Sequence, residues 1–300
     1  MTPRQLNMYA WTSFMWGASF YWLAIAIPEF GWAGTVSLRA FAASAILVLV
    51  AVATRRRLDF QGQWGNLAML GFTSVVLNLG GMNFALTRLD SSVTAILVST
   101  IPLYSVLIEW AWHRRRPTAT MLVGLVTGFS GVAILIGFTP QRIDGQFLLG
   151  FLGSVVGSAG FALGGSWAKA YLPNLGYHEQ TIGTFFFGGL FTLPLVAFVP
   201  IVVMPPSWQA IAALVIVAGT ASSFAYILYF TLVDEIGATK ALTTEFLVPV
   251  VAVILGVTLL GEHITIVQLV GAGAILVGCS MVLGLFSRQR PPLEQDVVAH

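Results

Sequence analysis

Residues 249–278 read PVVAVILGVTLLGEHITIVQLVGAGAILVG, two apolar runs separated by one short polar turn. A helix that spans a bilayer needs about 20 apolar residues, and both runs reach that length when they are extended outward. Glu262 and His263 lie in the turn, so we expect them at the outer membrane surface. A helical zinc site of the HExxH type would need a second His nearby, and the sequence has none there. We therefore interpret the pair as part of a hairpin turn and expect Glu262→Gln to be nearly silent.

The composition of the whole chain is as apolar as these two runs suggest. Of its 300 residues, 57% are hydrophobic and 9% are charged, and the mean hydropathy is +0.87. Soluble domains are about 25% charged, so these charges are too few to cover a water-exposed surface. The sequence predicts a polytopic membrane protein without a soluble catalytic domain. The single cysteine, Cys279, excludes an internal disulfide.

Ten stretches are long and apolar enough to span a membrane, and short turn-like segments separate them. We therefore predict an all-α polytopic membrane protein with ten transmembrane helices. The expected ranges are 7–27, 33–54, 65–87, 91–112, 119–138, 147–170, 179–200, 208–231, 238–260 and 264–286.

The positive charges predict the orientation of the chain, because Lys and Arg are concentrated in cytoplasmic loops. If both termini are cytoplasmic, 11 of the 14 Lys and Arg residues lie on the inner side, and the reverse orientation would place the same 11 outside. We expect a multi-pass protein of the cytoplasmic (inner or plasma) membrane with a cytoplasmic tail over 288–300. The 11 residues are Arg4, Arg55, Arg56, Arg57, Arg114, Arg115, Arg116, Lys169, Lys240, Arg288 and Arg290.

A shift of 147 residues aligns the two halves of the chain. The predicted domains are a five-helix repeat over 1–140 and a second over 145–287. Because five is odd, the second repeat has the opposite topology, and such inverted repeats are a common plan in secondary transporters. The shift pairs Pro102 with Pro249, Gly17 with Gly164, Ser19 with Ser166, Gly124 with Gly271 and Gly131 with Gly278.

Several motifs carry a family resemblance. The stretch from Pro249 to Gly278 combines a mid-helix Pro, the sequence L-G-E, Gln268 and glycines along the last helix. With WGASF at 16–20, the segment 39–41 and FALTRLDSSVTAILVSTIPL at 84–103, it resembles the EamA domain of the drug/metabolite transporter superfamily. The resemblance covers nearly the whole chain as two EamA units, although WHRRRP at 112–117 replaces L-G-E in the first half.

This resemblance implies a transporter that exports amino acids, metabolites or drugs. It also implies that helices 1, 3, 4, 6, 8 and 9 surround a central cavity, with helices 5 and 10 at the periphery.

Two ionisable residues lie inside expected helices, where charges are costly and usually face a cavity or a partner. Glu245 lies about two turns into the ninth helix, four residues before Pro249 and so on the same helical face, and its counterpart in the first half is Val98. Arg39 lies in the outer half of the second helix. We interpret both as coupling residues or members of an ion pair. Glu245 could carry a proton or bind a substrate ammonium group; a structural ion pair with Lys240 is the alternative.

Prolines and polar aromatic residues predict a binding cavity. Pro102 and Pro249 lie about midway along equivalent helices, where a Pro removes a hydrogen bond and kinks the helix. Kinks at equivalent positions of inverted repeats favour a site near the midplane. Aromatic walls with a few amides and hydroxyls suit a small amphipathic ligand. The expected cavity residues are Trp16, Phe20, Asn78, Asn83, Tyr104, Trp167 and Tyr226, with Ser222 and Tyr229 as further candidates.

The pattern as a whole favours a secondary transporter that exports a small metabolite, amino acid or drug by alternating access, with protons as a candidate coupling ion. A sugar-nucleotide or phosphate-ester carrier is the alternative, although such substrates need several cations deep in the site. An intramembrane enzyme is less favoured, because the sequence has no HExxH motif, nucleophile elbow or Walker loop. We expect no cofactor, metal or nucleic acid. The expected partners are the lipid bilayer and a small-molecule substrate, and a homodimer is left open.

Overall fold

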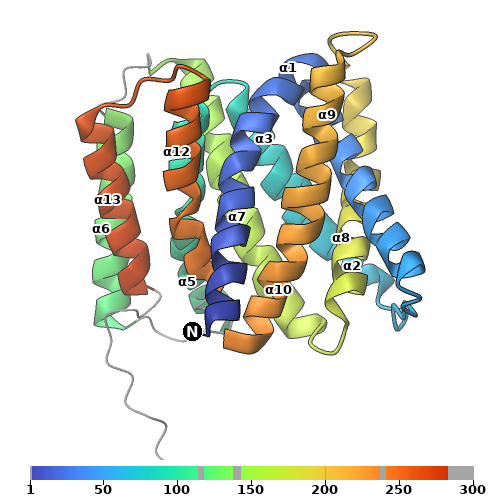
Figure 1. Ribbon diagram of the computed structural model, residues 1–300. Helices are drawn as coiled ribbons and strands as arrows, with labels where there is room; N and C mark the ends of the chain where they lie inside the picture. Colours follow the sequence, from blue (N-terminus) through green and yellow to red (C-terminus); the bar gives the residue numbers. More distant parts are fainter. Residues whose placement is uncertain (1, 114–117, 138–142, 200, 237–240, 283–300) are drawn as a thin grey trace, which may run out of the picture.

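The computed structural model describes residues 2–113, 118–137, 143–199, 201–236 and 241–282. Throughout these residues the regular structure is helical, without a strand. The helices stand side by side as a bundle, and the chain runs repeatedly between its two ends (Figure 1). α1 begins and α13 ends at the same end of the bundle (Figure 1). We call this the N-terminal end and the opposite one the far end.

The first element, α1 (Pro3–Ala53), holds the first two expected spans in one assignment of 51 residues. A straight helix of that length would measure about 75 Å, more than twice the thickness of a bilayer core. Gly31 breaks the helix with φ 68° and ψ 162°, a conformation that a side chain would resist. The chain therefore rises to the far end and descends again, as Figure 1 shows.

The other expected spans are built from shorter pieces. In the first half they are α2 (Trp64–Gly71), η1 (Phe72–Leu79), α3 (Gly80–Leu86), α4 (Ser91–Val98), α5 (Ile101–His113) and α6 (Ala119–Gly137). In the second half they are α7 (Gly145–Tyr171), α8 (Tyr177–Thr192), η2 (Leu193–Ala197), α9 (Trp208–Val217), η3 (Ala218–Phe224), α10 (Ala225–Ile236), η4 (Leu242–Phe246), α12 (Val248–Leu259) and α13 (Ile266–Val282).

By length and apolar composition, six described helices qualify as membrane spans, and three shorter apolar helices accompany them. Since α1 contains two expected spans, these segments correspond to the ten expected ranges. The protein is thus all-α with several membrane-length helices, and the exact number of crossings stays a prediction.

The two central prolines each stand just after a break within a membrane span, and their part in a binding site stays a prediction. Pro102 is the second residue of α5, after the break between α4 and α5. Pro249 is in the first turn of α12, and Leu247 separates it from η4. A Pro is well suited to a first turn, because the amide that it lacks has no partner inside the helix. Glu245 lies in η4, a 3-10 helix, so the expected face that it shares with Pro249 stays a prediction.

Two spans contain π-helical segments that the sequence did not predict. These are η1 in the third span and η3 in the eighth. Residues 72–79 correspond to 219–226 at the repeat offset of 147, so the two segments occupy overlapping positions in the two halves. π-helices are rare and are found frequently at functional sites.

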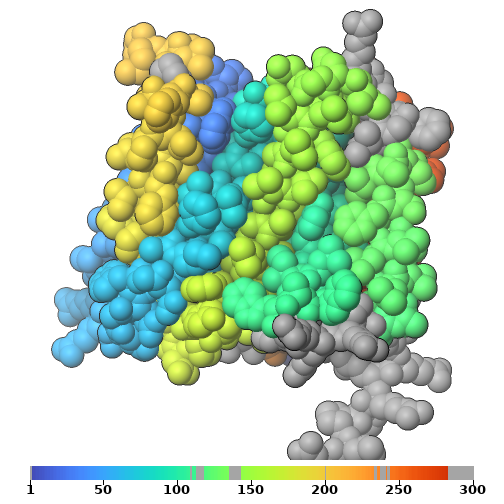
Figure 2. All heavy atoms as spheres, turned by 180° about the vertical axis from the view of Figure 1, so that it is seen from behind, coloured from blue at the N-terminus to red at the C-terminus, as the bar shows by residue number. Residues whose placement is uncertain are grey.

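Glycines allow the helices to approach closely, as small residues do in membrane proteins. A Cβ added to Gly81 would lie 2.5 Å from the carbonyl oxygen of Gly153, so α3 and α7 meet at backbone contact. Figure 2 shows the face of the bundle on which α7 crosses beside the α2–α3 segment. α6 and α13 pack in the same way, since a Cβ on Gly278 would lie 2.6 Å from the carbonyl oxygen of Gly124. This pair stands at the edge of the bundle, where the family resemblance placed helices 5 and 10 (Figure 1).

Candidate functional site

A cluster of aromatic side chains lies at the centre of the bundle. The ring centroid of Trp16 on α1 lies 5.7 Å from that of Tyr226, 5.1 Å from Tyr229 and 6.3 Å from Phe161. Trp16 is 9% exposed and donates its indole N–H to the carbonyl oxygen of Ala221 at 3.1 Å. Phe20 is buried in the same cluster. The cluster joins the first repeat, through α1, to the second, through α7 and α10.

The π-helix η3 binds two of the predicted site residues. It supplies the Ala221 carbonyl that holds Trp16, and the next residue, Ser222, accepts a hydrogen bond from Nε of Arg39 at 2.5 Å. Ser223 also donates to the carbonyl oxygen of Ala218 at 2.8 Å, inside the same segment. The widened turns of η3 thus fix the edge of the aromatic cluster.

Arg39 is a buried cation, with 2% of its surface exposed. Its Nη1 atom has no hydrogen-bond partner within the described part of the chain. Arg39 is bound to Ser222, which follows the Ala221 carbonyl that holds Trp16. Arg39 therefore borders the aromatic cluster without a matching carboxylate among the described residues.

Glu245 is a buried carboxyl group, 4% exposed and carried by η4. It interacts electrostatically with Tyr226 and with Tyr229. No ion pair joins Glu245 to another residue that the structure describes. Lys240, the partner considered from the sequence, lies outside the described residues. Tyr226 thus lies near both Arg39 and Glu245.

The other predicted cavity residues are distributed around this centre. Asn78 lies on η1 and is 6% exposed, and Asn83 lies on α3, fully buried, with both amide atoms lacking a partner in the described structure. Tyr104 on α5 packs on the central cluster and has its ring 6.1 Å from that of Phe129. Trp167 lies apart from Trp16.

Trp167 belongs to a second aromatic group, towards the N-terminal end. Its ring is 4.3 Å from that of Tyr171 and 6.0 Å from that of Trp112. Both neighbours are partly exposed, as expected for aromatic residues at a membrane interface. The structure therefore does not bring Trp167 together with Trp16, Phe20 and Tyr226.

Some residues of the centre were not found from the sequence. Phe185 is fully buried and its ring lies 5.1 Å from that of Tyr226, while Phe161 contacts both Trp16 and Tyr229. Phe185 is the first of three consecutive phenylalanines, and Phe186 beside it is 46% exposed. The sequence alone gives no sign of which of the three faces inward.

At the far end, carboxylates join the two repeats. Glu262 accepts hydrogen bonds from the backbone amides of Ser91 and Ser92 at 2.8 and 3.0 Å, and from both serine hydroxyls. A carboxylate is stabilised there, because the first amides of a helix have no partner inside it. Glu29 binds Ser207 at the start of α9, accepting from its amide and its hydroxyl at 2.6 Å each. Glu262 is therefore more than a turn residue, and its expected silence must be revised.

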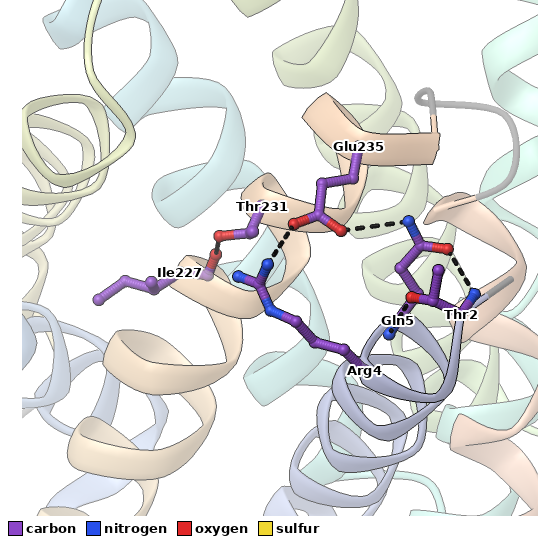
Figure 3. A network of polar contacts seen from close by, with 6 residues as sticks. All are labelled: Thr2, Arg4, Gln5, Ile227, Thr231 and Glu235. Carbon is purple, nitrogen blue, oxygen red and sulfur yellow. Dashed lines mark hydrogen bonds and ion pairs between the residues drawn. The ribbon is translucent and has the colours of Figure 1, made fainter.

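At the N-terminal end, two ion pairs join the repeats. Arg4 and Glu235 are 3.2 Å apart, and Gln5 donates to the same carboxylate at 3.2 Å (Figure 3). Thr2 and Gln5 form a reciprocal cap on α1 (Figure 3). The second pair is Arg56 with Glu179, 3.5 Å apart, in which the glutamate side chain is 6% exposed. Polar contacts between the repeats are thus present at both ends of the bundle.

A groove on the surface of the bundle has a volume of about 560 Å³. It lies between the α2–η1 segment and the end of the seventh span. Every lining residue is apolar, so the groove suits a hydrocarbon chain and has no group that would recognise a polar solute. The lining residues are Gly65, Ala68, Met69, Phe72, Val76, Phe191 and Leu195.

Comparisons with known proteins agree with this architecture. Residues 8–137 and 148–284 each match the model of a family described as the EamA-like transporter family. A protein of Bacillus subtilis (strain 168) named uncharacterized transporter YoaV is 25% identical over 281 residues, which cover 92% of this chain and 95% of the relative. Protein PecM of Dickeya dadantii (strain 3937) is 25% identical over 288 residues, 94% of each chain. A solved crystal structure superposes with a TM-score of 0.68, covering 96% of this chain and 99% of the other. Its sequence identity of 14% shows a shared fold alone.

Proposed function

Because the chain belongs to the EamA-like transporter family, we propose that it is a secondary transporter that exports a small amphipathic solute by alternating access. The observation that carries this proposal is the central aromatic cluster, bordered by one buried cation and one buried carboxyl group. Aromatic walls with a few polar groups are typical of sites for small amphipathic ligands. The cluster is built from both repeats, as a central site between inverted repeats requires.

The same site disfavours phosphate esters as substrates. A phosphate ester carries more negative charge than one buried cation can balance. Arg39 is the one cation that is buried among the described residues. We therefore propose a substrate with at most one negative charge and an apolar body.

We propose that both termini face the cytoplasm and that the far end faces outward. The exposed Arg55 and Arg57 lie in the loop that follows α1, at the N-terminal end. Cytoplasmic loops are enriched in such residues. In this orientation the contacts of Glu262 and Glu29 close the outer side.

Glu245 is the proposed coupling residue. A buried carboxyl group without an ion pair can bind a proton when the site is open to one side and release it to the other, or it can bind a substrate ammonium group. Both roles need the same oxygen atoms, so substrate and proton would compete. The neutral Glu245→Gln variant keeps the shape of the side chain and removes a charge that is costly to bury.

The test is flux in proteoliposomes, with and without a pH gradient, for a panel of labelled amino acids, amines and organic acids. We expect wild type to transport a member of the panel faster with a proton gradient, and Glu245→Gln to lose this dependence or all flux while melting at or above the wild-type temperature. Asp59→Asn, which changes an exposed carboxylate in the loop after α1, is the matched control. A Glu245→Gln protein that is unstable but keeps its pH dependence would show that Glu245 is structural.

A further inference from the structure

The guanidinium group of Arg39 has hydrogen-bonding capacity that the described protein does not use. Arginine has five N–H donors and no acceptor. Nε donates to Ser222, whereas the buried Nη1 atom has no partner among the described residues. A buried charge without a partner destabilises a protein, and Arg at the centre of a membrane helix is costly to insert. We expect a residue with this cost and no structural ion pair to bind an anionic ligand that the protein itself does not supply.

The surroundings of Arg39 define what kind of anion it can meet. Ser222 accepts a hydrogen bond from the guanidinium and Tyr226 lies near it, and each hydroxyl can hydrogen-bond to an anion. Tyr226 belongs to the aromatic cluster, with its ring 5.7 Å from that of Trp16 and 5.1 Å from that of Phe185. A ligand held by Arg39 would therefore place its apolar part among aromatic rings.

The nearby buried carboxyl group does not neutralise Arg39. Glu245 also interacts with Tyr226, but the structure contains no ion pair between Glu245 and Arg39. Because Arg39 is not paired with Glu245, its guanidinium group stays available to a ligand. One cation matches one singly charged anion, and the planar guanidinium fits a carboxylate in particular, through two parallel hydrogen bonds.

We propose that Arg39, together with Ser222 and Tyr226, binds the carboxylate group of the transported solute. This inference rests on the proposed transport function, and it names the chemical class of the substrate: a monocarboxylate with an apolar or aromatic body.

The test measures binding separately from transport. Purified full-length protein is titrated with acetate, hexanoate and phenylacetate and with the neutral amide of each, and affinity is read from thermal shifts and from Trp fluorescence. We expect phenylacetate or hexanoate to bind wild type at least tenfold more tightly than the matching amide. Arg39→Met should abolish this preference and should melt at or above the temperature of the ligand-free wild type, because the apolar side chain removes an unpaired buried charge. Arg57→Met, at an exposed position, is the control and should keep the preference.

Two further measurements keep the proposal falsifiable. Arg39→Lys keeps the charge and loses the planar fork, so it should retain a weaker carboxylate preference even if Arg39→Met fails to fold. Equal binding of acids and amides by wild type, or a carboxylate preference that survives in Arg39→Met, overturns the proposal. Carboxylate binding without flux in proteoliposomes would refute the transport function and leave the site standing. Equal flux in wild type and Arg39→Met would refute the carboxylate site and leave the transport function standing.

Discussion

Replacing Glu262 with Gln tests the contact that joins the two repeats at the far end of the bundle. Asp90 stands at the N-cap position of α4, but the first two amides of the helix donate to Glu262, 171 and 170 residues away in sequence. Gly256 permits this approach, since a Cβ there would lie 2.5 Å from Oε2 of Glu262. In Glu262→Gln one oxygen becomes an NH₂ group that faces two donors, and the remaining oxygen loses its charge.

The size of the effect follows from the four hydrogen bonds. Bonds to a charged group contribute about 1.5–3 kcal/mol each and neutral ones about 0.5–1.5 kcal/mol. The serine hydroxyl beside the new NH₂ group can rotate and accept from it, so one bond, from the serine amide, is lost, at about 1.5–3 kcal/mol. With the weakening of the other bonds at a half-buried position, the free energy of unfolding should fall by about 2–4 kcal/mol, which includes about 0.3–1 kcal/mol from the helix dipole. For a chain of this size we expect Tm to fall by roughly 5–10 °C.

The assay is thermal unfolding of the purified protein, followed by Trp fluorescence. His263→Gln is the matched control, because His263 is the exposed neighbour of Glu262 in the same turn; its change should stay within about 0.5 kcal/mol. The double variant Ser91→Ala/Ser92→Ala removes the partner hydroxyls. When the serine substitutions are combined with Glu262→Gln, the protein should lose less stability than the sum of the separate losses, because the residues act through shared hydrogen bonds. A Glu262→Gln protein that melts within 1 °C of wild type, or strictly additive losses, would refute the assigned contact.

Two other predictions address the site and the orientation. Trp16→Ala should remove three ring contacts and the bond to Ala221, so we expect at least a tenfold change in the ratio of transport rates between aromatic and aliphatic substrates; unchanged ratios in proteoliposomes would contradict the aromatic wall. On a Cys279→Ser background, a cysteine at exposed position 263 should react with a membrane-impermeant maleimide from outside intact cells and one at exposed position 57 only after lysis. The opposite labelling pattern would invert the proposed topology.

The fold class could be predicted because the physical signal is strong and local. Apolar runs of membrane length indicate spans without any knowledge of neighbours, and the described helices begin and end close to most of the expected ranges. The fine structure inside the spans carried no such signal. The π-helices η1 and η3 differ from α-helix by a shift of backbone hydrogen bonds, which apolar residues allow without a distinctive sequence.

The site was partly predictable for a related reason. Arg39 and Glu245 stand out because a charge inside an apolar run is costly wherever it faces, and Trp16, Phe20 and Tyr226 stand out as aromatic residues of the central helices. Their partners depend on tertiary contacts across more than a hundred residues. The bond from Arg39 to Ser222 spans 183 positions, and the bonds to Glu262 span 170 or more. Glu262 was misjudged because its turn is local, whereas its partners are not.

The two repeats share a backbone plan but not their chemistry. At the offset of 147 residues the π-helices overlap and the two prolines coincide. The residues of the centre have apolar counterparts: Arg39 corresponds to Phe186, Glu245 to Val98, and Ser222 to Val75.

In transporters built from inverted repeats, the shared backbone plan of the two halves allows two similar shapes of the protein, which open to opposite sides of the membrane. In the proposed mechanism, single copies of a cation and a carboxyl group make those two shapes unequal in energy once a solute or proton is bound. We expect the solute to bind in one orientation, with its anionic end at Arg39 of the first repeat. Glu245, the proposed coupling residue, belongs to the other repeat, so each half contributes one buried ionisable group to the proposed site.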